Sequence, residues 1–518
     1  MISYRKQNQI STTRSSGILL HITSLPSLYG IGDLGHSSRR FIDFLSEMNQ
    51  KFWQILPTND PENFNSPYDA NSAFAQNPLL ISLDLLLEEN ILSKREVGKI
   101  PNFSEKSVEF EKVKEWKYPI LEKAASNFYY DKAESTMYKR FCIQNSFWLD
   151  DYAAFKIIKK LQVNSSWKDW KTNYRQHNKE LVQSIVAEYE FEVHKIKILQ
   201  YFFYKQWQGI KLYAKKRNVE FIGDIPIYVS YNSADVWSNS KLFKLNQNGS
   251  MKYQSGCPPD HFSNRGQLWG PPIYDWELHL RSNFLWWESR LKYAMKFVDI
   301  VRIDHFNGFA KYWEVPIRNK TARKGKWVYS PGEQLLMQIM GTKKNSVKII
   351  AEDLGAAAKD AEKIRKKFGI PGMTILQYEY FNNDRTFLEV EETVLYTGTH
   401  DNDTIVGWYL DLAKKSSKKD INLIPNFNDS LNKESNWFFM DVALKSRART
   451  VIIPFQDLIG LGTEGRMNIP GTTDVKNWTW RASDRDLDRK FISRMNTLMK
   501  NSKRKRKVSL TLPISQPK

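Results

Sequence analysis

Three acidic residues in the second half of the chain stand at nearly equal intervals. Asp304 lies within the motif Arg302–His305, Glu352 follows it by 48 residues, and Asp401 follows Glu352 by 49 residues, next to His400. Two carboxylates acting on one bond, with a third nearby, suit cleavage of a glycosidic bond through an oxocarbenium-like transition state. Any one of these acids alone is better explained as a helix cap at a strand end. The three together, with basic or imidazole side chains alongside, favour a catalytic role.

The neighbours of these acids indicate how the chemistry would be divided. A nucleophile has to be an ionised carboxylate, and Arg302, two residues before Asp304 on one strand, places a positive charge on the same face. A general acid needs a raised pKa, and the apolar residues around Glu352 provide the setting that raises it. Asp401 beside His400 is suited to hydrogen-bonding sugar hydroxyls. Spacing alone does not distinguish the nucleophile from the acid.

Aromatic and polar side chains are mixed in three segments that are rich in turn-forming residues. Sugars present apolar C–H faces that stack on aromatic rings, and hydroxyls that need polar partners. The segments 66–69, 228–232 and 256–270 combine both kinds of side chain, and we expect them to be loops over the site. Trp53 and Trp207, in contrast, are predicted to be core residues.

The acids need a scaffold that brings them together, and the pattern of apolar runs predicts one. Eight short, β-branched segments alternate with helical stretches, as in a (β/α)8 TIM barrel of the α/β class, which carries its chemistry at the C-terminal ends of its strands. The predicted strands are 17–22, 52–57, 219–224, 297–303, 347–352, 373–378, 393–399 and 451–455.

Outside these strands, the chain divides into a catalytic region and two flanking extensions. Residues 88–190 have helical spacing and little β signal, so they are predicted to be a helical insertion in the barrel. We expect an N-terminal extension over 1–16, the catalytic barrel with its insertion over 17–500, and a basic tail over 501–518.

Composition restricts the function classes further. The chain has 518 residues, a net charge of +20 and two cysteines, too few for a disulfide framework. It lacks an apolar run long enough for a membrane span, metal-ligand spacings, a phosphate-binding loop and the G-x-S-x-G motif. We therefore expect a cytoplasmic protein, with a plastid as the alternative, that holds no metal and binds neither membrane nor specific nucleic acid.

With these residues assembled, the chain resembles the 4-α-glucanotransferases of the amylomaltase/disproportionating-enzyme family, glycoside hydrolase family 77. The resemblance runs in order from residue 17 to residue 481, and the helical insertion matches least. Its most specific parts are the segments 66–68, 223–228, 256–260, 266–270, 302–306, 351–355, 397–404 and 466–472.

The resemblance implies a role for each of the three acids: Asp304 would be the nucleophile, Glu352 the acid/base and Asp401 the transition-state stabiliser. Seven further residues would contact the sugar: Tyr68, Asp224, Pro258, Trp269, Arg302, His305 and His400. Of these, Tyr68 and Trp269 would be stacking aromatics, and the loop around Pro258 would be a lid. Family members need no cofactor and pass a glucan from an α-1,4-glucan or maltooligosaccharide to the 4-hydroxyl of glucose or another glucan. We expect a monomer or a homodimer.

Three positions depart from the family pattern. Asn307 stands where Arg is usual, Ser330 where Gly is usual, and Asp69 where Gln is common. Because all three acids are retained, these changes bear on subsite preference and rate more than on the chemistry. The alternatives left open are an α-glucan hydrolase, a catalytically impaired glucan-binding homologue, and a nucleic-acid module built on the basic tail.

Overall fold

Eight parallel strands form the centre of the molecule. The computed structural model describes residues 10, 13–163, 165–259, 263–340, 347–355, 357–380, 385–415 and 434–504. In spatial order the strands of the main sheet are β10-β11-β12-β1-β2-β3-β6-β9. Their bounds are β1 (Ser15–Leu19), β2 (Phe52–Gln54), β3 (Glu220–Pro226), β6 (Ile300–Asp304), β9 (Ile349–Ala351), β10 (Gly372–Ile375), β11 (Thr393–Tyr396) and β12 (Thr450–Pro454). All eight predicted strands are confirmed, and so is the (β/α)8 barrel.

The sheet closes on itself between β9 and β10. The Ala351 N–H donates to the Pro371 carbonyl at 3.0 Å. The Asp353 carboxylate adds a second link, because it accepts a hydrogen bond from the Met373 N–H at 3.0 Å. A closed barrel leaves no sheet edge exposed, and this closure fixes the end of β9, directly before Glu352.

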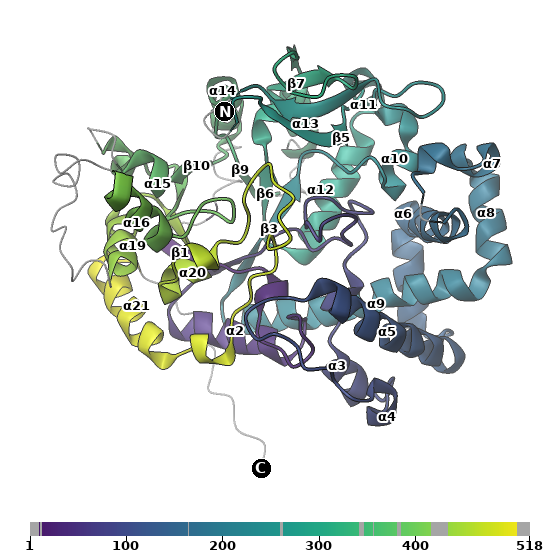
Figure 1. The fold of residues 1–518 in the computed structure, drawn as a ribbon, viewed down its shortest axis with the longest axis horizontal. Coiled ribbons are helices and arrows are strands. Elements are labelled where there is room, and N and C mark those ends of the chain that lie inside the picture. The colour runs from purple at the N-terminus through teal and green to yellow at the C-terminus, as the bar shows by residue number, and fades with distance from the viewer. Residues whose placement is uncertain are drawn as a thin grey trace.

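Helices surround the barrel, as the alternating pattern predicts (Figure 1). Those between or after the strands are α2 (His36–Glu47), α3 (Leu83–Glu88), α9 (Glu190–Lys216), α10 (Ala234–Ser238), α11 (Trp276–Arg281), α12 (Leu285–Phe297), α13 (Gly332–Met340), α14 (Ala358–Phe368), α15 (Leu376–Glu379), α16 (Ile405–Lys415), α19 (Ser435–Lys445), α20 (Phe455–Ile459) and α21 (Arg489–Asn501).

The region predicted to be helical, 88–190, contains helices and lies to one side of the barrel (Figure 1). It comprises α4 (Lys94–Val97), α5 (Phe110–Lys132), α6 (Thr136–Leu161), α7 (Thr172–Arg175) and α8 (Lys179–Glu188). Both α5 and α6 pack against α9, the long amphipathic helix that leads into β3. The limits of the insertion and of the two extensions as domains stay predictions.

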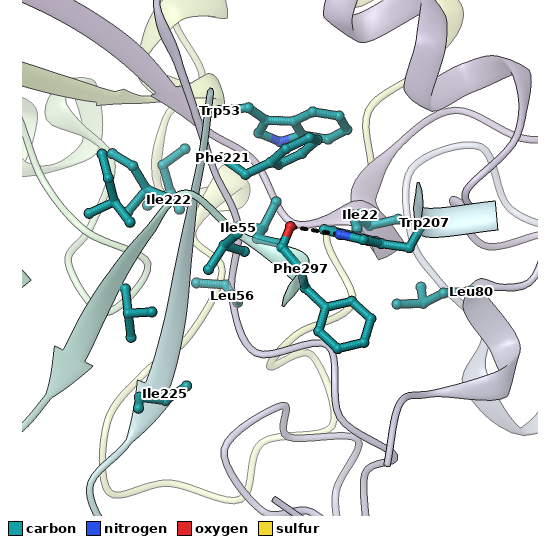
Figure 2. Close-up of a cluster of buried hydrophobic side chains, with 14 of the residues drawn as sticks. Ile22, Trp53, Ile55, Leu56, Leu80, Trp207, Phe221, Ile222, Ile225 and Phe297 are labelled. Carbon is teal, nitrogen blue, oxygen red and sulfur yellow. Dashed lines mark hydrogen bonds between the residues drawn. The ribbon is translucent and has the colours of Figure 1, made fainter. Parts of the chain in front are cut away.

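The core beneath α9 joins that helix to the strands (Figure 2). Trp207 on α9 and Trp53 on β2 are both fully buried, as predicted. The Trp207 indole packs against Phe221 of β3 at 5.3 Å between ring centroids, and its Nε1–H donates to the Phe297 carbonyl at 2.7 Å. Such a ring contributes both apolar area and one satisfied polar group, which fixes the orientation of α9 on the barrel.

A second, four-stranded antiparallel sheet corrects one expectation. Segment 256–270 is predicted as a loop, but it contains the end of β4 (Tyr253–Cys257) and most of β5 (Gln267–Pro272). These strands pair, in the order β5-β4-β7-β8, with β7 (Lys311–Pro316) and β8 (Lys326–Tyr329). Gly and Pro concealed the strand signal: the register between β4 and β5 shifts at Gln254/Gly256, and Gly270 has a φ of +93°.

The C-terminal end of the described chain is anchored under the barrel. Arg504 belongs to the segment 501–518 that is predicted to be a basic tail, yet only 1% of its surface is exposed. Its guanidinium donates to five backbone carbonyls, those of Ser15, Leu444, Ser446, Ala448 and Arg449. Of the expected basic tail, residues 505–518 lie outside the described residues.

Candidate active site

The predicted site residues converge on a cavity of about 580 Å³ at the C-terminal ends of the barrel strands. Asp304, at the end of β6, lines this cavity together with His305, Tyr68 and Trp269. Four more of the predicted residues contact members of this group directly, namely Asp224, Arg302, Glu352 and His400, and Asp401 lies 3.4 Å from His400. The barrel therefore collects, at one face, side chains that lie more than 300 positions apart in the sequence.

A buried guanidinium joins two carboxylates at the base of the cavity. The register of β3 and β6 places Asp224 opposite Arg302. Arg302 Nη1 donates to both oxygens of Asp224, at 2.8 and 2.6 Å, and to Oδ1 of Asp304 at 2.9 Å. Although burial alone would lower the Arg302 pKa, the two carboxylates raise it well above its usual value. The positive charge beside Asp304 is thus fixed.

Glu352 has the opposite environment. Burial, and after it the negative charge of Asp304, raises the pKa of Glu352 well above its usual value. Its Oε2 accepts a hydrogen bond from the His305 N–H at 2.5 Å, which holds the carboxyl next to the Asp304–His305 peptide. One carboxylate has a fixed countercharge and its neighbour favours the protonated state, which is the contrast that a nucleophile and a general acid need.

His305 adopts a backbone conformation that connects these two groups. Its φ is +51°, in the left-handed region that side chains other than Gly rarely occupy. That conformation turns its N–H toward Glu352, and its ring contacts Trp269 edge to face at 4.6 Å. Burial lowers the pKa of His305 to about 4, so the imidazole is neutral at pH 7. Backbone strain at such a position is retained where the surroundings enforce it, and functional sites are where it clusters.

The third acid, Asp401, is held in place by hydrogen bonds from Asn468 and Arg466. Asn468 donates from Nδ2 to Asp401 Oδ1 at 2.6 Å, and Arg466 donates to the Asp401 carbonyl at 2.7 Å. Neither residue was assigned a role from the sequence, although both lie in a segment that carries the family resemblance. His400 Nε2 lies 3.4 Å from the same carboxylate oxygen.

An aromatic stack completes this wall of the cavity. The Tyr68 ring lies nearly parallel to the His400 imidazole at 5.2 Å, and its hydroxyl donates to Asp224 at 2.8 Å. Trp478 approaches both rings at 5.7 Å and lines the cavity. Sequence reasoning missed Trp478 because it follows the last strand in a segment without an expected element. Its φ of +68° shows that a turn presents the ring.

The helical region braces the loop that carries Tyr68. Asp60 on this loop is 2% exposed, and its Oδ2 accepts hydrogen bonds from Tyr152 and Lys156 of α6, both at 3.0 Å. Lys159, one helical turn further, pairs with Glu62. A neutralised, nearly buried carboxylate at this place fixes the loop's position over the barrel, so the helices contribute to the site without lining it.

Pro258 is the one predicted residue that no contact places at the site. It follows β4 and does not line the cavity, and residues 260–262 next to it lie outside the described chain. The lid role predicted for this segment therefore stays a prediction.

The three departures from the family pattern have distinct surroundings. Asn307 is buried, donates to the Leu354 carbonyl at 2.5 Å, and its Oδ1 accepts from none of the described groups. Ser330 donates to the Gly308 carbonyl at 2.8 Å. Asp69 lines the cavity and accepts hydrogen bonds from Ser230 and Asn63. Only Asp69 is therefore placed to contact a ligand.

The described residues include neither a metal-ligand cluster nor a membrane-spanning helix. In the part of the chain that the structure covers, no three or more His, Cys, Asp or Glu side chains are grouped as a metal ion would require. Among the described helices, none combines the length and apolar character needed to cross a membrane.

The family model described as 4-alpha-glucanotransferase, glycoside hydrolase family 77, matches residues 20–487. The chain belongs to this family. Family members that it resembles include the 4-alpha-glucanotransferase of Synechocystis, 40% identical over 477 residues that make up 90% of this chain and 94% of the relative. The chloroplastic/amyloplastic 4-alpha-glucanotransferase of Arabidopsis thaliana is 39% identical, over 90% and 81% of the two chains.

A solved structure of a 4-alpha-glucanotransferase relative agrees in fold. The amylomaltase of Streptococcus agalactiae, solved in complex with acarbose, superposes with a TM-score of 0.88 and 34% sequence identity, covering 95% of this chain and all of that one. The predicted membership of the family is thereby confirmed, and with it the enzyme class, a transferase of 4-α-glucanotransferase type.

Proposed function

We propose that the protein transfers α-1,4-glucan segments by a retaining, two-step mechanism in which Asp304 is the nucleophile and Glu352 the acid/base. The observation that carries this proposal is the contrast between the two neighbouring carboxyls. Arg302 places a positive charge 2.9 Å from Asp304, whereas burial and the charge of Asp304 raise the pKa of Glu352 and so favour its protonated form. This is the division that retaining cleavage of a glycosidic bond needs.

In the first step, Asp304 attacks C1 of the glucosyl unit while Glu352 gives its proton to the departing O4. The C1–O4 bond breaks and a bond from C1 to the Asp304 carboxylate forms. Arg302 engages Oδ1, so the attack is assigned to Oδ2. Asp401, fixed by Asn468, would hydrogen-bond the sugar and support the positive charge that develops on the ring.

In the second step, a 4-hydroxyl of an acceptor sugar attacks C1 of the covalent intermediate. Glu352, now ionised, takes the proton of that hydroxyl, and Asp304 leaves as a carboxylate. Glucose or the non-reducing end of another glucan is the acceptor that we infer. Stacking surfaces for it are offered by Tyr68, Trp269 and Trp478 at the cavity. Neither step requires an organic cofactor.

The wider setting is likewise proposed. The two cysteines suit a reducing compartment such as the cytoplasm, and the chloroplastic relative keeps the plastid as the alternative. We expect a monomer or a homodimer. The helical region 88–190 is proposed to be part of one catalytic unit with the barrel, because α6 supplies the partners of Asp60 beside the cavity.

The test is chromatographic analysis of products from maltotriose, with the Asp304→Asn and Glu352→Gln variants as controls. Glucose plus a ladder of longer maltooligosaccharides, absent with both variants, is the expected result. Maltose and glucose without longer products would identify a hydrolase instead. Unchanged maltotriose over several donor lengths, with folded protein, would refute transfer and leave a glucan-binding protein.

A further inference from the structure

A second cavity of about 550 Å³ lies away from the catalytic one and shares no lining residue with it. It is enclosed by α6 of the helical region, by α10 and the short turn Ser240–Leu242 that follows it, and by the start of α12. Its volume falls within the range of about 300–1,000 Å³ that small-molecule sites occupy.

The walls of this second cavity are aromatic. Phe74 is at their centre: it stacks on Trp148 at 6.2 Å and meets Phe147 and Trp286 edge to face at 5.4 and 6.3 Å. Phe147 is 50% exposed, and Leu285, which lines the same cavity, is 60% exposed. Two large apolar side chains thus face solvent across a hollow, where packing within the protein does not explain them.

The rim of the same cavity is polar and of both signs. Asp151 and His177 form a hydrogen-bonded pair at 2.8 Å, and Lys241 and Asn239 lie among the lining residues. Four serines add hydroxyl groups: Ser238, Ser240, Ser282 and Ser289. Donors and acceptors occur together without an excess of one charge, which favours a neutral, polyhydroxylated ligand over an ion. Aromatic walls with such a rim match a sugar, which has apolar faces and a belt of hydroxyls.

Two chain segments pass directly from the catalytic cavity to the second one. Residues Tyr68 and Asp69 line the first cavity, and Ser72 and Phe74 the second. Residues 226–228 and 230–232 line the first, and 234–235 and 238–242 the second. Asp235 ties the two segments together, because its Oδ2 accepts the Ala73 N–H at 2.7 Å. The linings of the two cavities are therefore separated by only a few residues along each segment.

We propose that the second cavity is an accessory binding site for a stretch of α-glucan chain, which retains long glucans beside the catalytic cavity. The choice of glucan over other neutral sugars rests on the proposed function, whereas the site itself rests on its lining. Long substrates would gain affinity from a second point of attachment, and short ones such as maltotriose would bind at the catalytic cavity alone.

The test compares two variants with a matched control. Phe147→Ser removes the exposed ring from the cavity wall, and Ser289→Trp fills the cavity. Tyr130→Ser removes a ring that is 75% exposed on α5, in the same helical region but outside the cavity. Each protein is run in native gels with and without soluble amylose, and its kinetics are measured with amylose and with maltotriose. Circular dichroism and thermal unfolding establish that each variant is folded.

We expect amylose to retard the wild type and Tyr130→Ser equally, and both cavity variants less. Their KM for amylose should rise about three- to tenfold, with maltotriose kinetics unchanged. Equal retardation of all four proteins, no retardation of any, or an equal loss in Tyr130→Ser would overturn the accessory site. Retardation that depends on the cavity, in a protein that forms no transfer products, would support the site and refute the proposed function.

Discussion

Arg302 offers the sharpest test of how the site is charged. Replacing it by Met keeps most of the side-chain volume and removes the guanidinium from between Asp224 and Asp304. The Asp224 side chain is 0% exposed, so it would keep a buried charge that still accepts the Tyr68 hydroxyl but has lost its cationic partner. Breaking a buried ion pair in this way typically costs about 3–5 kcal/mol, and we expect Arg302→Met to lose that much unfolding free energy.

The effect on catalysis has a separate origin. Arg302 donates one charge-assisted hydrogen bond to Asp304 at 2.9 Å, an interaction worth about 2–3 kcal/mol. If the transition state loses all of it, kcat falls about 30- to 150-fold. Denaturant unfolding measures the first quantity, and initial rates of maltotriose disproportionation measure the second.

The double variant Arg302→Met/Asp224→Asn separates the two effects. Neutralising Asp224 removes the orphaned charge, so most of the lost stability should return while kcat stays low. Recovery of both stability and kcat to nearly wild-type values would refute the reasoning, because it would show that Arg302 acts only by compensating Asp224. An Arg302→Met protein as stable as the wild type would refute the burial argument.

Three more predictions follow from groups behind the catalytic cavity. Glu352→Gln should abolish transfer, yet its stabilising effect on the fold should increase as pH rises above about 4.5. The reason is that the raised pKa lets the native Glu352 carboxyl keep a proton that the unfolded chain releases. A difference in melting temperature between variant and wild type that is constant from pH 5 to 9 would contradict this. Burial raises the pKa of Asp457 to about 7 from its usual 3.8, a shift that corresponds to roughly 4 kcal/mol. The unfolding free energy of the wild type should therefore fall between about pH 4 and 7, whereas that of Asp457→Asn should not. Chemical unfolding at several pH values measures this difference, and parallel pH curves for the two proteins would argue against it. Asn468→Ala removes the hydrogen bond to Asp401 and should lower kcat for maltotriose about tenfold. The unfolding free energy should change by no more than about 1.5 kcal/mol. An unchanged kcat would show that Asn468 does not contribute to the site.

Sequence patterns predicted the barrel well because its strands are buried on both faces. Each is a short run of β-branched and apolar residues, such as Val451–Ile453 in β12, and each is fully or mostly buried. The antiparallel sheet was not predicted because β4 contains a Gly, and β5 contains a Gly and two Pro and is mostly half-exposed. Strands of that kind show no regular alternation of apolar and polar residues.

The acids were predictable for a different reason from their supports. The three acids Asp304, Glu352 and Asp401 stand at or after the C-terminal ends of strands. A (β/α)8 barrel gathers residues at those positions on one face. Asn468 and Trp478 come from an irregular segment after the last strand, and their position depends on tertiary contacts that no local pattern encodes. Arg504 shows the same limit, because a run of basic residues does not reveal which one meets a ring of carbonyl groups.

The contacts of Arg504 have a consequence for the order of folding during synthesis. β1 is made first but needs β12, more than 400 residues later, as one of its two neighbours, and Arg504 then joins the Ser15 carbonyl to those of residues 444–449. Until the ribosome has delivered β12, β1 keeps one edge unpaired, and an unpaired edge favours aggregation. Nascent chains stalled before residue 450 should therefore depend on chaperones, and those that have exposed residue 504 should not.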